Sequence, residues 1–527
     1  MIIDLLQPEA LPQRHSPVCI VGAGAAGISL AVELAKLGTT VTVLESGGAG
    51  EEKATQDLYA SEISGVHHAG IHNGRFRILG GTTTRWAGQI LELDSHNFEV
   101  RPWVANSGWP FQKDVLTPYY QRAIELEGLA SGITDDESVW RAIKSPPPDF
   151  GDQLVPFFSR WCPQPNFAAL HRQDLSSSEK VAVCLHANLR EILLTEGQQA
   201  IAGLRCQTLT GQSAVFTADR YVFCLGGIES ARVLLQPLAD GKAAPWNASG
   251  LVGRYFQDHL DATILEVKPL NKRRLNQWFD NVYRSALQYR PYLKLSFNEQ
   301  RRRECLAISS TVLFQNGAST EAFDRFREVV GQVRHGNKRA VDLLRAACRL
   351  NPRLLLGKTI RRGVQGRAYN PADAGISLRF HCEQSPNTDS RIELTADRDA
   401  TGMLRTRLHW AVMEQELHTV RQFAQVITEA FERTGFGRVV VNRALETNDS
   451  NLIHLFEDAY HHMGATRMAD SPQRGVVDAN LRIFGIDNGY VCSSSVFPSS
   501  GFANPTHTVI ALACRLAEHL AGSAPAH

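Results

Sequence analysis

The chain has 527 residues, a formal net charge of +1 and an ordinary apolar fraction of 43%. At roughly 100–200 residues per domain, this length predicts about three domains or two large ones. The near-zero charge argues against binding to nucleic acid, and ten cysteines without a CxxC pair form neither a disulfide framework nor a metal site.

The N-terminal residues show no targeting signal. Residues 1–14 contain acids and prolines but no apolar core of a signal peptide. The chain has no run of about twenty apolar residues, so no transmembrane helix is predicted. We therefore expect a cytoplasmic globular protein.

The first informative segment has the pattern of a nucleotide-binding unit. Residues 18–21 are an apolar run typical of a buried strand, and the glycine turn GAGAAG follows at residues 22–27. A predicted helix over residues 28–36 leads to a second strand at 41–44, which ends at Glu45. The order strand, glycine turn, helix, strand and acid predicts an ADP-containing dinucleotide without separating FAD from NAD. An empty Rossmann-like unit is the alternative.

Each residue of this pattern has its own task. Gly22 permits a tight turn, Gly24 lets the backbone approach a pyrophosphate, and Gly27 lets helix and strand pack closely. The pyrophosphate would lie at the helix N-terminus beside Ala25. Glu45 would accept a hydrogen bond from a ribose hydroxyl.

A turn rich in glycine and threonine follows at residues 80–84, with the sequence GGTTT. Such a turn can bring backbone N–H groups against a polar ligand edge. Ile78 and Trp86 on its two sides favour a buried ligand contact over a mere surface turn. Contacts are expected from Gly81, Thr82 and Thr83.

A second junction of strand, glycine and helix lies at residues 221–235, around Gly226. A proline-rich linker at 146–148 separates it from the first junction. One Rossmann domain that is interrupted by a large insertion fits this arrangement better than two separate sites.

The middle of the chain predicts a mixed sheet backed by helices. Strand-like runs occur at residues 292–297, 306–308, 312–314, 377–381, 391–394 and 404–408, and a helix is predicted from Glu414 to Arg433. The stretch from Arg334 to Arg367 is strongly basic and contains a single acid, Asp342. A solvated helix face is one interpretation; a docking surface for an electron-transfer partner, an anionic membrane or an anionic substrate is the other.

The C-terminal part supplies residues suited to alcohol oxidation, in which a hydroxyl proton and a carbon-bound hydride leave. A base with a pKa near the working pH favours histidine, such as His461. A second polar group, such as Asn504, should hold the oxygen as charge develops. By residue type alone, a histidine of the core and a turn asparagine before Pro505 are the alternatives.

Taken together, these segments resemble the glucose–methanol–choline (GMC) family of FAD-dependent oxidoreductases. The resemblance rests on residues 22–27 with Glu45, 80–84, 226–232, 252–256 and 461–520, in the family's order. It favours FAD over NAD. Residues 107–110, 118–120 and 383–391 are similar to the bacterial sugar and polyol dehydrogenase or pyranose-oxidase-like branch.

The resemblance implies an α/β fold with an α+β second domain. A Rossmann-type FAD-binding domain would be assembled from residues 14–100, 179–261 and 456–525. A substrate-binding domain with a mixed sheet backed by helices would take residues 101–178 and 262–455.

The resemblance also implies the roles of the site residues. His461 would be the general base, Asn504 would position the oxygen, and the hydride would pass to flavin N5. His462 is expected to point away, since neighbours on an extended chain face opposite sides. Further cofactor contacts are implied at Leu189, Gly226, Ser493, Ser494, Pro505 and Thr506.

Two residues depart from the family pattern. Some pyranose-oxidase-like relatives bond FAD covalently to a histidine in the glycine turn, where this chain has Arg85, so we expect non-covalent FAD. Phe502, two residues before Asn504, indicates either a more apolar pocket or a side chain that packs away from it.

The predicted function is therefore FAD-dependent oxidation of an alcohol, on a hydroxyl of a sugar, polyol or glycoside. Alternatives are oxidation of an apolar or sterol-like alcohol, a non-oxidative lyase reaction on the same scaffold, and a non-enzymatic docking role for the basic stretch. Oxygen, a quinone or a redox protein could reoxidise the flavin.

Overall fold

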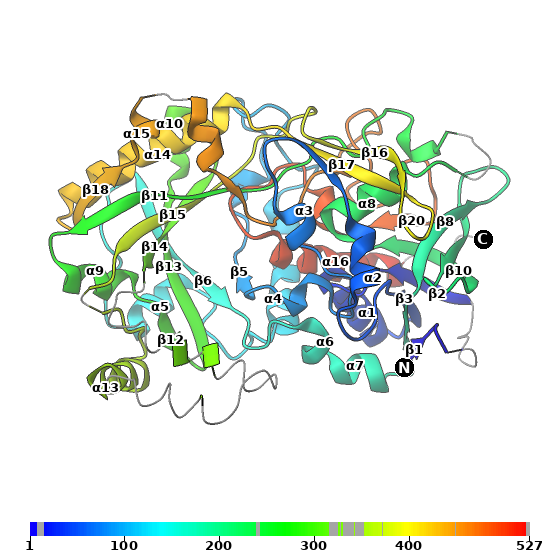
Figure 1. The fold of residues 1–527 in the computed structure, drawn as a ribbon, viewed down its shortest axis with the longest axis horizontal. Helices are drawn as coiled ribbons and strands as arrows, with labels where there is room; N and C mark the ends of the chain where they lie inside the picture. The colour runs from blue at the N-terminus through cyan, green and yellow to red at the C-terminus, as the bar shows by residue number, and fades with distance from the viewer. Residues whose placement is uncertain are drawn as a thin grey trace.

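The computed structural model describes residues 1–7, 15–238, 243–315, 325–326, 328–329, 342, 352–371, 373–447 and 450–522. Half of the basic stretch from Arg334 to Arg367, namely residues 334–341 and 343–351, lies outside these ranges. Figure 1 shows two halves: a first sheet lies in the right half with the N-terminus, and a second sheet lies in the left half.

The first sheet has eight strands in the order β1-β7-β3-β2-β10-β9-β8, with β20 beside β10. Strands β1, β7, β3, β2, β10 and β20 pair in parallel, whereas β8, β9 and β10 pair antiparallel. Their bounds are β1 Ile2–Asp4, β2 His15–Val21, β3 Val41–Leu44, β7 Val181–Leu185, β8 Asn188–Leu194, β9 Ile201–Gln207, β10 Ser213–Phe223 and β20 Gly489–Val491.

The core of this sheet follows from its sequence. Every residue of β3 is buried, as expected for a parallel strand covered on both faces. Helix α1 (Ala25–Lys36) follows β2 and packs against α16 (Pro505–Gly522), the last helix of the chain. Helix α8 (Gly226–Leu235) follows β10. The two predicted strand–glycine–helix junctions therefore belong to one sheet, and the C-terminal helix lies against the first.

The second sheet has nine strands in the order β18-β11-β15-β14-β13-β6-β5, with β12 beside β13 and β19 beside β11. All of its pairs are antiparallel. Their bounds are β5 Gln89–Ile90, β6 Leu154–Trp161, β11 Leu260–Pro269, β12 Val282–Arg284, β13 Leu287–Leu295, β14 Ile308–Phe314, β15 Ile376–Cys382, β18 Gly437–Val441 and β19 Glu457–Asp458.

Helix α14 (Glu414–Arg433) backs this sheet, and its apolar side chains such as Phe423 and Ile427 are fully buried. The predicted bounds of this helix match the structure. The apolar runs at 306–308 and 312–314 were predicted as two possible strands, but residues 308–314 form the single strand β14.

A third, three-stranded sheet joins distant parts of the chain. It contains β16 (Arg391–Arg398), β17 (Leu404–Trp410) and β4 (Glu62–Gly65). The predicted domain bounds place residues 391–410 in the substrate-binding domain, yet these strands pair with β4 and contact α8. The division into domains stays a prediction.

The remaining described elements are short. The helices are α2 Lys53–Gln56, α3 Gly70–Asn73, α4 Thr117–Leu126, α5 Asp136–Ala142, α6 Phe167–Leu170, α7 Arg172–Ser177, α9 Lys272–Phe279, α10 Phe297–Arg303, α13 Pro352–Thr359 and α15 Arg443–Glu446. One-turn helices lie at Asp57–Tyr59, Gly81–Thr84, Ser95–Asn97, Lys113–Val115, Pro245–Asn247, Ser450–Leu455 and Ser494–Val496, and a π-turn at Ile360–Val364.

The mixed α/β fold with several sheets confirms the predicted fold class. Among the described residues, no helix has both the length and the apolar character needed to cross a membrane.

Candidate active site

A cavity opens where the glycine turn meets the N-terminus of α1. Gly22 has a φ of +103°, which the tight turn requires. A Cβ on Gly24 would meet nothing within 4 Å, so the backbone there borders open space. A Cβ on Gly27 would instead lie 1.9 Å from the carbonyl oxygen of Gly22. Gly24 therefore leaves room for a ligand, and Gly27 is needed for close packing.

The cavity collects residues from all parts of the chain that the sequence singled out. Gly27 does not line it, and Asn504 lies next to it rather than in its wall. The predicted cofactor residues that line it are Gly22, Gly24, Ala25, Glu45, Gly81, Thr82, Thr83, Leu189, Gly226, Ser493, Ser494, Pro505 and Thr506.

Glu45 is buried at one end of the cavity. Its Oε2 accepts a hydrogen bond from the N–H of Ala23 at 2.9 Å, and its Oε1 accepts from the N–H of Gly47 at 2.8 Å. Burial raises the pKa of Glu45, and these hydrogen bonds oppose that rise. The carboxylate thus holds the glycine turn in place and keeps acceptor capacity for a ligand.

The glycine–threonine turn closes another side of the cavity. The N–H of Gly80 donates to the carbonyl oxygen of Ala23 at 2.9 Å, which ties this turn to the first one. Gly80 and Gly81 have φ values of +97° and +54°, so the turn needs glycine at both positions. The hydroxyl of Thr83 accepts from the N–H of Phe167 at 3.1 Å.

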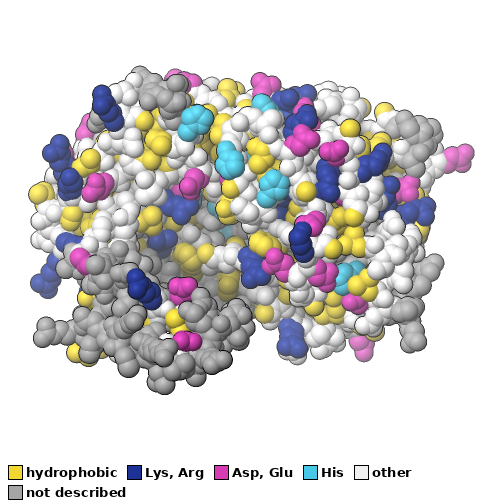
Figure 2. Space-filling model, in the orientation of Figure 1, with side chains coloured by type: hydrophobic (Ala, Val, Ile, Leu, Met, Phe, Trp, Pro, Cys, Tyr) yellow, Lys and Arg dark blue, Asp and Glu magenta, His cyan; other side chains and the backbone are white. Residues whose placement is uncertain are grey.

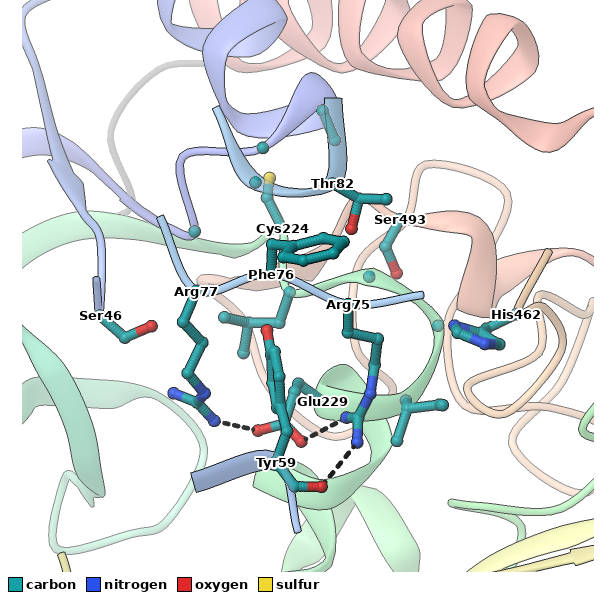
Figure 3. Close-up of a pocket in the computed structure, with 18 of the residues that line it drawn as sticks. Ser46, Tyr59, Arg75, Phe76, Arg77, Thr82, Cys224, Glu229, His462 and Ser493 are labelled. Atoms are coloured by element: carbon teal, nitrogen blue, oxygen red, sulfur yellow. Dashed lines mark hydrogen bonds and ion pairs between the residues drawn. The ribbon is translucent and has the colours of Figure 1, made fainter. Parts of the chain in front are cut away.

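An arginine cluster forms the floor of the cavity (Figure 3). Glu229 accepts from Arg75 Nη1 at 2.9 Å and from Arg77 Nη2 at 2.6 Å, and the two guanidinium groups flank the ring of Tyr59. Burial alone would raise the pKa of Glu229, but Arg232, Arg77 and Arg75 outweigh it and hold the pKa at about 2.

The cluster leaves a positive surplus. Arg232 also bonds Asp399 through Nη2 at 2.5 Å, so three arginines face two carboxylates. Glu45 lines the cavity as a third carboxylate, so the cavity as a whole has no surplus of positive charge, but α1 points its free N–H groups at the same space. This arrangement fits the pyrophosphate of FAD, with the ADP part at α1 and Glu45 and the far end toward His461.

His461 borders the opposite end of the cavity and is held by two side chains. Its Nε2 lies 3.1 Å from Nδ2 of Asn504, and its Nδ1 lies 2.9 Å from Nδ1 of His259. The two residues chosen from the sequence are thus brought together from positions 43 residues apart. His259 is a third member that the sequence did not indicate.

The hydrogen bonds fix the tautomer of His461. With the Asn504 amide oriented as in the structure, Nδ2 donates, so Nε2 of His461 must accept and carries no proton. The proton then lies on Nδ1, which donates to His259. Burial, together with the neighbouring His259 and His381, holds the pKa of His461 well below its ordinary value. His461 is therefore neutral at ordinary pH, with an unprotonated Nε2 that accepts a hydrogen bond from Asn504.

One buried carboxylate anchors this arrangement. Asp258 Oδ1 accepts from the backbone N–H of His259 at 2.7 Å and of His461 at 2.9 Å. Its Oδ2 pairs with Nε2 of His68 at 3.0 Å. Asp258 thus fixes the backbone of both facing histidines.

His462 turns away from Asn504 yet also borders the cavity. Its Nε2 lies 3.8 Å from Asp258 Oδ2, and the ligand atoms of His68, Asp258 and His462 lie within 4.8 Å of one another, as in a metal site. The N–H of Ile71 already donates to Nδ1 of His68, however, and Nε2 of His68 bonds Asp258. These hydrogen bonds account for His68 and Asp258, whereas Nε2 of His462 makes no hydrogen bond within the described part of the chain.

The second sheet turns a polar face toward His461. Its register pairs Lys294 with Ser309 and Ser309 with His381, so the three side chains share one face. The ring of His381 lies 6.4 Å from that of His461. Four buried atoms of this face make no hydrogen bond within the described part of the chain: Trp161 Nε1, Arg290 Nε, Ser309 Oγ and His381 Nδ1.

Arg85 and Phe502, the two residues that depart from the family pattern, both lie in the described part of the structure. Arg85 pairs with Glu51 at 2.6 Å, and its side chain is more than half exposed, outside the cavity. Phe502 is buried and packs on Phe157, with ring centroids 5.6 Å apart, beneath Lys294. Phe502 therefore fills a space between the two sheets.

Comparison with known proteins identifies the family. Residues 386–513 match the family model described as GMC oxidoreductase. Over 96% of the chain and 95% of the relative, the sequence is 22% identical to 2-methyl-1,2-propanediol dehydrogenase of Mycolicibacterium austroafricanum. It is 21% identical to the fructose dehydrogenase large subunit of Gluconobacter japonicus, over 95% of the chain and 97% of the relative.

Two solved structures share the fold. Pyridoxine 4-oxidase from Mesorbium loti superposes with a TM-score of 0.54 at 17% identity, over 96% of this chain and 99% of that one. A formate oxidase variant from Aspergillus oryzae RIB40 gives a TM-score of 0.57 at 15% identity, over 97% and 99%. These structures show a shared fold. The family model and the full-length relatives confirm the resemblance that the motifs indicate: this chain is an oxidoreductase with the C-terminal domain of the GMC family, a family that binds FAD.

Proposed function

We propose that the protein oxidises a hydroxyl group of a sugar, polyol or glycoside to a carbonyl. The observation that carries this proposal is the pair formed by His461 Nε2 and Asn504 Nδ2, 3.1 Å apart beside the cofactor cavity. One group accepts a proton and the other donates a hydrogen bond, and an alcohol oxygen needs both.

FAD, when bound, would take up the carbon-bound hydrogen with its electron pair. The side chains of the protein handle the proton and the oxygen of the hydroxyl group. Nε2 of His461 removes the hydroxyl proton, and the amide of Asn504 donates to the oxygen as negative charge develops on it. His259 keeps the proton of His461 on Nδ1, so that Nε2 stays unprotonated and a substrate hydroxyl can take the place of its contact with Asn504.

The polar face of the second sheet supports a hydroxylated substrate over an apolar or sterol-like alcohol. Buried donors without partners are costly unless a ligand satisfies them. Trp161, Arg290, Ser309 and His381 each present such an atom on the face that looks toward His461. A substrate with several hydroxyl groups would satisfy them, whereas a sterol-like ring system would not.

The test is anaerobic flavin bleaching in a stopped-flow instrument, with sugars, polyols and aliphatic alcohols as substrates. Replacing His461 by Gln should lower the reduction rate constant by about 10²–10⁴-fold, the usual contribution of a positioned base. Asn504→Ala should lower it by about 10²–10³-fold, as the loss of an oxyanion donor does. A His461→Gln variant that reduces its flavin at the wild-type rate would rule out the base assignment.

The same proposal includes dissociable FAD. Arg85 cannot form a covalent link to flavin and lies outside the cavity. Acid precipitation of the holoenzyme should leave the yellow colour in the supernatant. Flavin that stays with the protein pellet would contradict this part.

A further inference from the structure

The second sheet carries a cation that its own structure does not neutralise. The register of β6 and β13 pairs Ser159 with Arg290 and Phe157 with Tyr292, without interruption from residue 288 to 295. Side chains two apart along a strand share a face, so Arg290, Tyr292 and Lys294 lie together. Phe157 and Tyr292 contact each other on this face, and Phe157 also meets Phe502.

Two of the three cations on this face have carboxylate partners. Lys294 binds Asp94 at 2.6 Å. Arg379, which also lies on this face because Thr311 pairs with it, binds Asp261 through two nitrogens. Each of these pairs is close to neutral.

Arg290 differs from them. Its guanidinium makes no hydrogen bond and no ion pair with any described residue, although the side chain is half-buried and its Nε is fully shielded from solvent. Its charge acts on His381 and helps to lower the pKa of that histidine, after burial as the first cause. His381 in turn lies 6.4 Å, ring to ring, from His461. The unpaired charge therefore lies on the same face of the second sheet as the histidine that neighbours His461.

A half-buried guanidinium without a partner is a site for an anion, because Arg offers a planar fork that matches carboxylate and phosphate oxygens. Figure 2 shows the surface hollowed between the halves that hold the first and the second sheet, with Lys or Arg side chains visible inside the hollow. A substrate that enters there would meet positive charge before it meets His461.

We propose that Arg290 forms an anion subsite, and that the substrate is a hydroxylated compound that carries an acid group, a carboxylate or a phosphate. This inference rests on the proposed function and restricts its substrates to those with an acid group. Ser309, His381 and Trp161 would bind the hydroxyl groups between the acid and the reacting carbon.

The test compares matched substrates in anaerobic flavin bleaching of the holoenzyme. One series is sorbitol, gluconate and sorbitol 6-phosphate; the other is glucose, glucuronate and glucose 6-phosphate. Wild-type protein should reduce its flavin at least about tenfold faster with one of the two acids than with the neutral compound of the same series. Whether the carboxylate or the phosphate compound reacts faster shows which acid group the subsite binds. Arg290→Gln should lower that ratio by about tenfold to hundredfold, the value of a charged hydrogen bond. Arg290→Lys should keep part of it.

The matched control is Arg301→Gln, an exposed arginine of α10, which should leave the ratio unchanged. A wild-type protein that prefers the neutral partner, or an Arg290→Gln variant with an unchanged ratio, would overturn the proposal. Flavin content and unfolding temperature of each variant exclude a folding defect, and Arg290→Lys carries the test if Arg290→Gln does not fold.

A second measurement does not need turnover. Oxidised holoenzyme is titrated with inorganic phosphate and with acetate while the flavin absorbance is followed. Binding that weakens about tenfold to hundredfold in Arg290→Gln supports the subsite even if no sugar or polyol bleaches the flavin, in which case only the proposed function fails. Bleaching by neutral polyols without anion binding would refute the subsite and leave the proposed function standing.

Discussion

Replacing His259 by Leu tests whether the tautomer of His461 is set by the protein. The Nδ1–H of His461 donates to Nδ1 of His259 at 2.9 Å, and His259 is fully buried. Leu would leave that N–H without an acceptor in a buried site, at a cost of about 1–3 kcal/mol. Moving the proton to Nε2 or turning the ring avoids this cost, but both remove the free lone pair that the base needs. We therefore expect flavin reduction to slow by about fivefold to a hundredfold.

Asn at the same position distinguishes this explanation from a loss of packing. The Oδ1 of Asn can reach the place of Nδ1 and accept the same proton, so His259→Asn should recover most of the rate lost in His259→Leu. His96→Phe is the matched control, since His96 is a buried histidine that stacks on Phe297. Stopped-flow reduction at equal flavin content gives the three rates. Equal losses in the Asn and Leu variants, or no loss in either, would refute the tautomer argument.

Three other perturbations follow from the geometry. The flavin reduction rate should stay constant as pH falls through 6.5 and drop only further into the acid range, because His461 must be neutral and its pKa is held low; a stopped-flow pH series in which the rate falls near 6.5 would contradict this. Arg101→Met should destabilise the protein by about 3–5 kcal/mol in denaturant unfolding, since the carboxylate of Glu383 would stay buried without its charge partner. Gly24→Ala should fold normally but bind FAD more weakly in a fluorescence titration, whereas Gly27→Ala should fail to fold well, because only the second Cβ collides with backbone.

The Arg101 prediction has a control on the surface. Arg85 and Glu51 form an ion pair at 2.6 Å with side chains 58% and 43% exposed. An exposed pair contributes about 0–1 kcal/mol. If Arg85→Met and Arg101→Met destabilise the protein equally, burial does not decide the strength of these pairs.

The sequence predicts best those elements whose burial leaves a simple pattern. Strand β3 has the predicted bounds, since a strand covered on both faces is apolar throughout. Helix α1 starts at Ala25, three residues before the predicted start at Ile28. The prediction starts too late because glycine has a low helix propensity, whereas the structure needs Gly27 inside the helix for its close contact with Gly22.

Polar residues inside strands are harder to read. Ser309, Ser310 and Thr311 interrupt an apolar run, so the sequence suggests two short strands where β14 is one. Ser310 and Thr311 bond strand backbone through their hydroxyls, whereas Ser309 lies on the face toward His461, where the proposed function gives it a substrate hydroxyl as partner. Local sequence carries no signal that distinguishes such a position from a turn.

The proposed catalytic pair and its support differ in how far they can be predicted. Family motifs point to His461 and Asn504, and the structure brings them within 3.1 Å. His259 lies 202 residues from His461 in sequence, and their contact depends on the pairing of β11 with β19. The run Gln257, Asp258 and His259 just before β11 is the one local hint, since three polar residues in a row at the start of a buried strand need a reason.

The pairing of β20 with β10 bears on how the chain is made. Residues 221–223 of β10 pair with β2 on one side and with residues 489–491 on the other, so this end of the strand has one unpaired edge until most of the chain has left the ribosome. Such an edge recruits other chains. The segment that completes the sheet also carries Ser493, Ser494 and Asn504, so the edge closes and the cofactor cavity is completed in the same late step. Expression yield should therefore depend on flavin supply during synthesis, when bound FAD can favour the closed edge over aggregation.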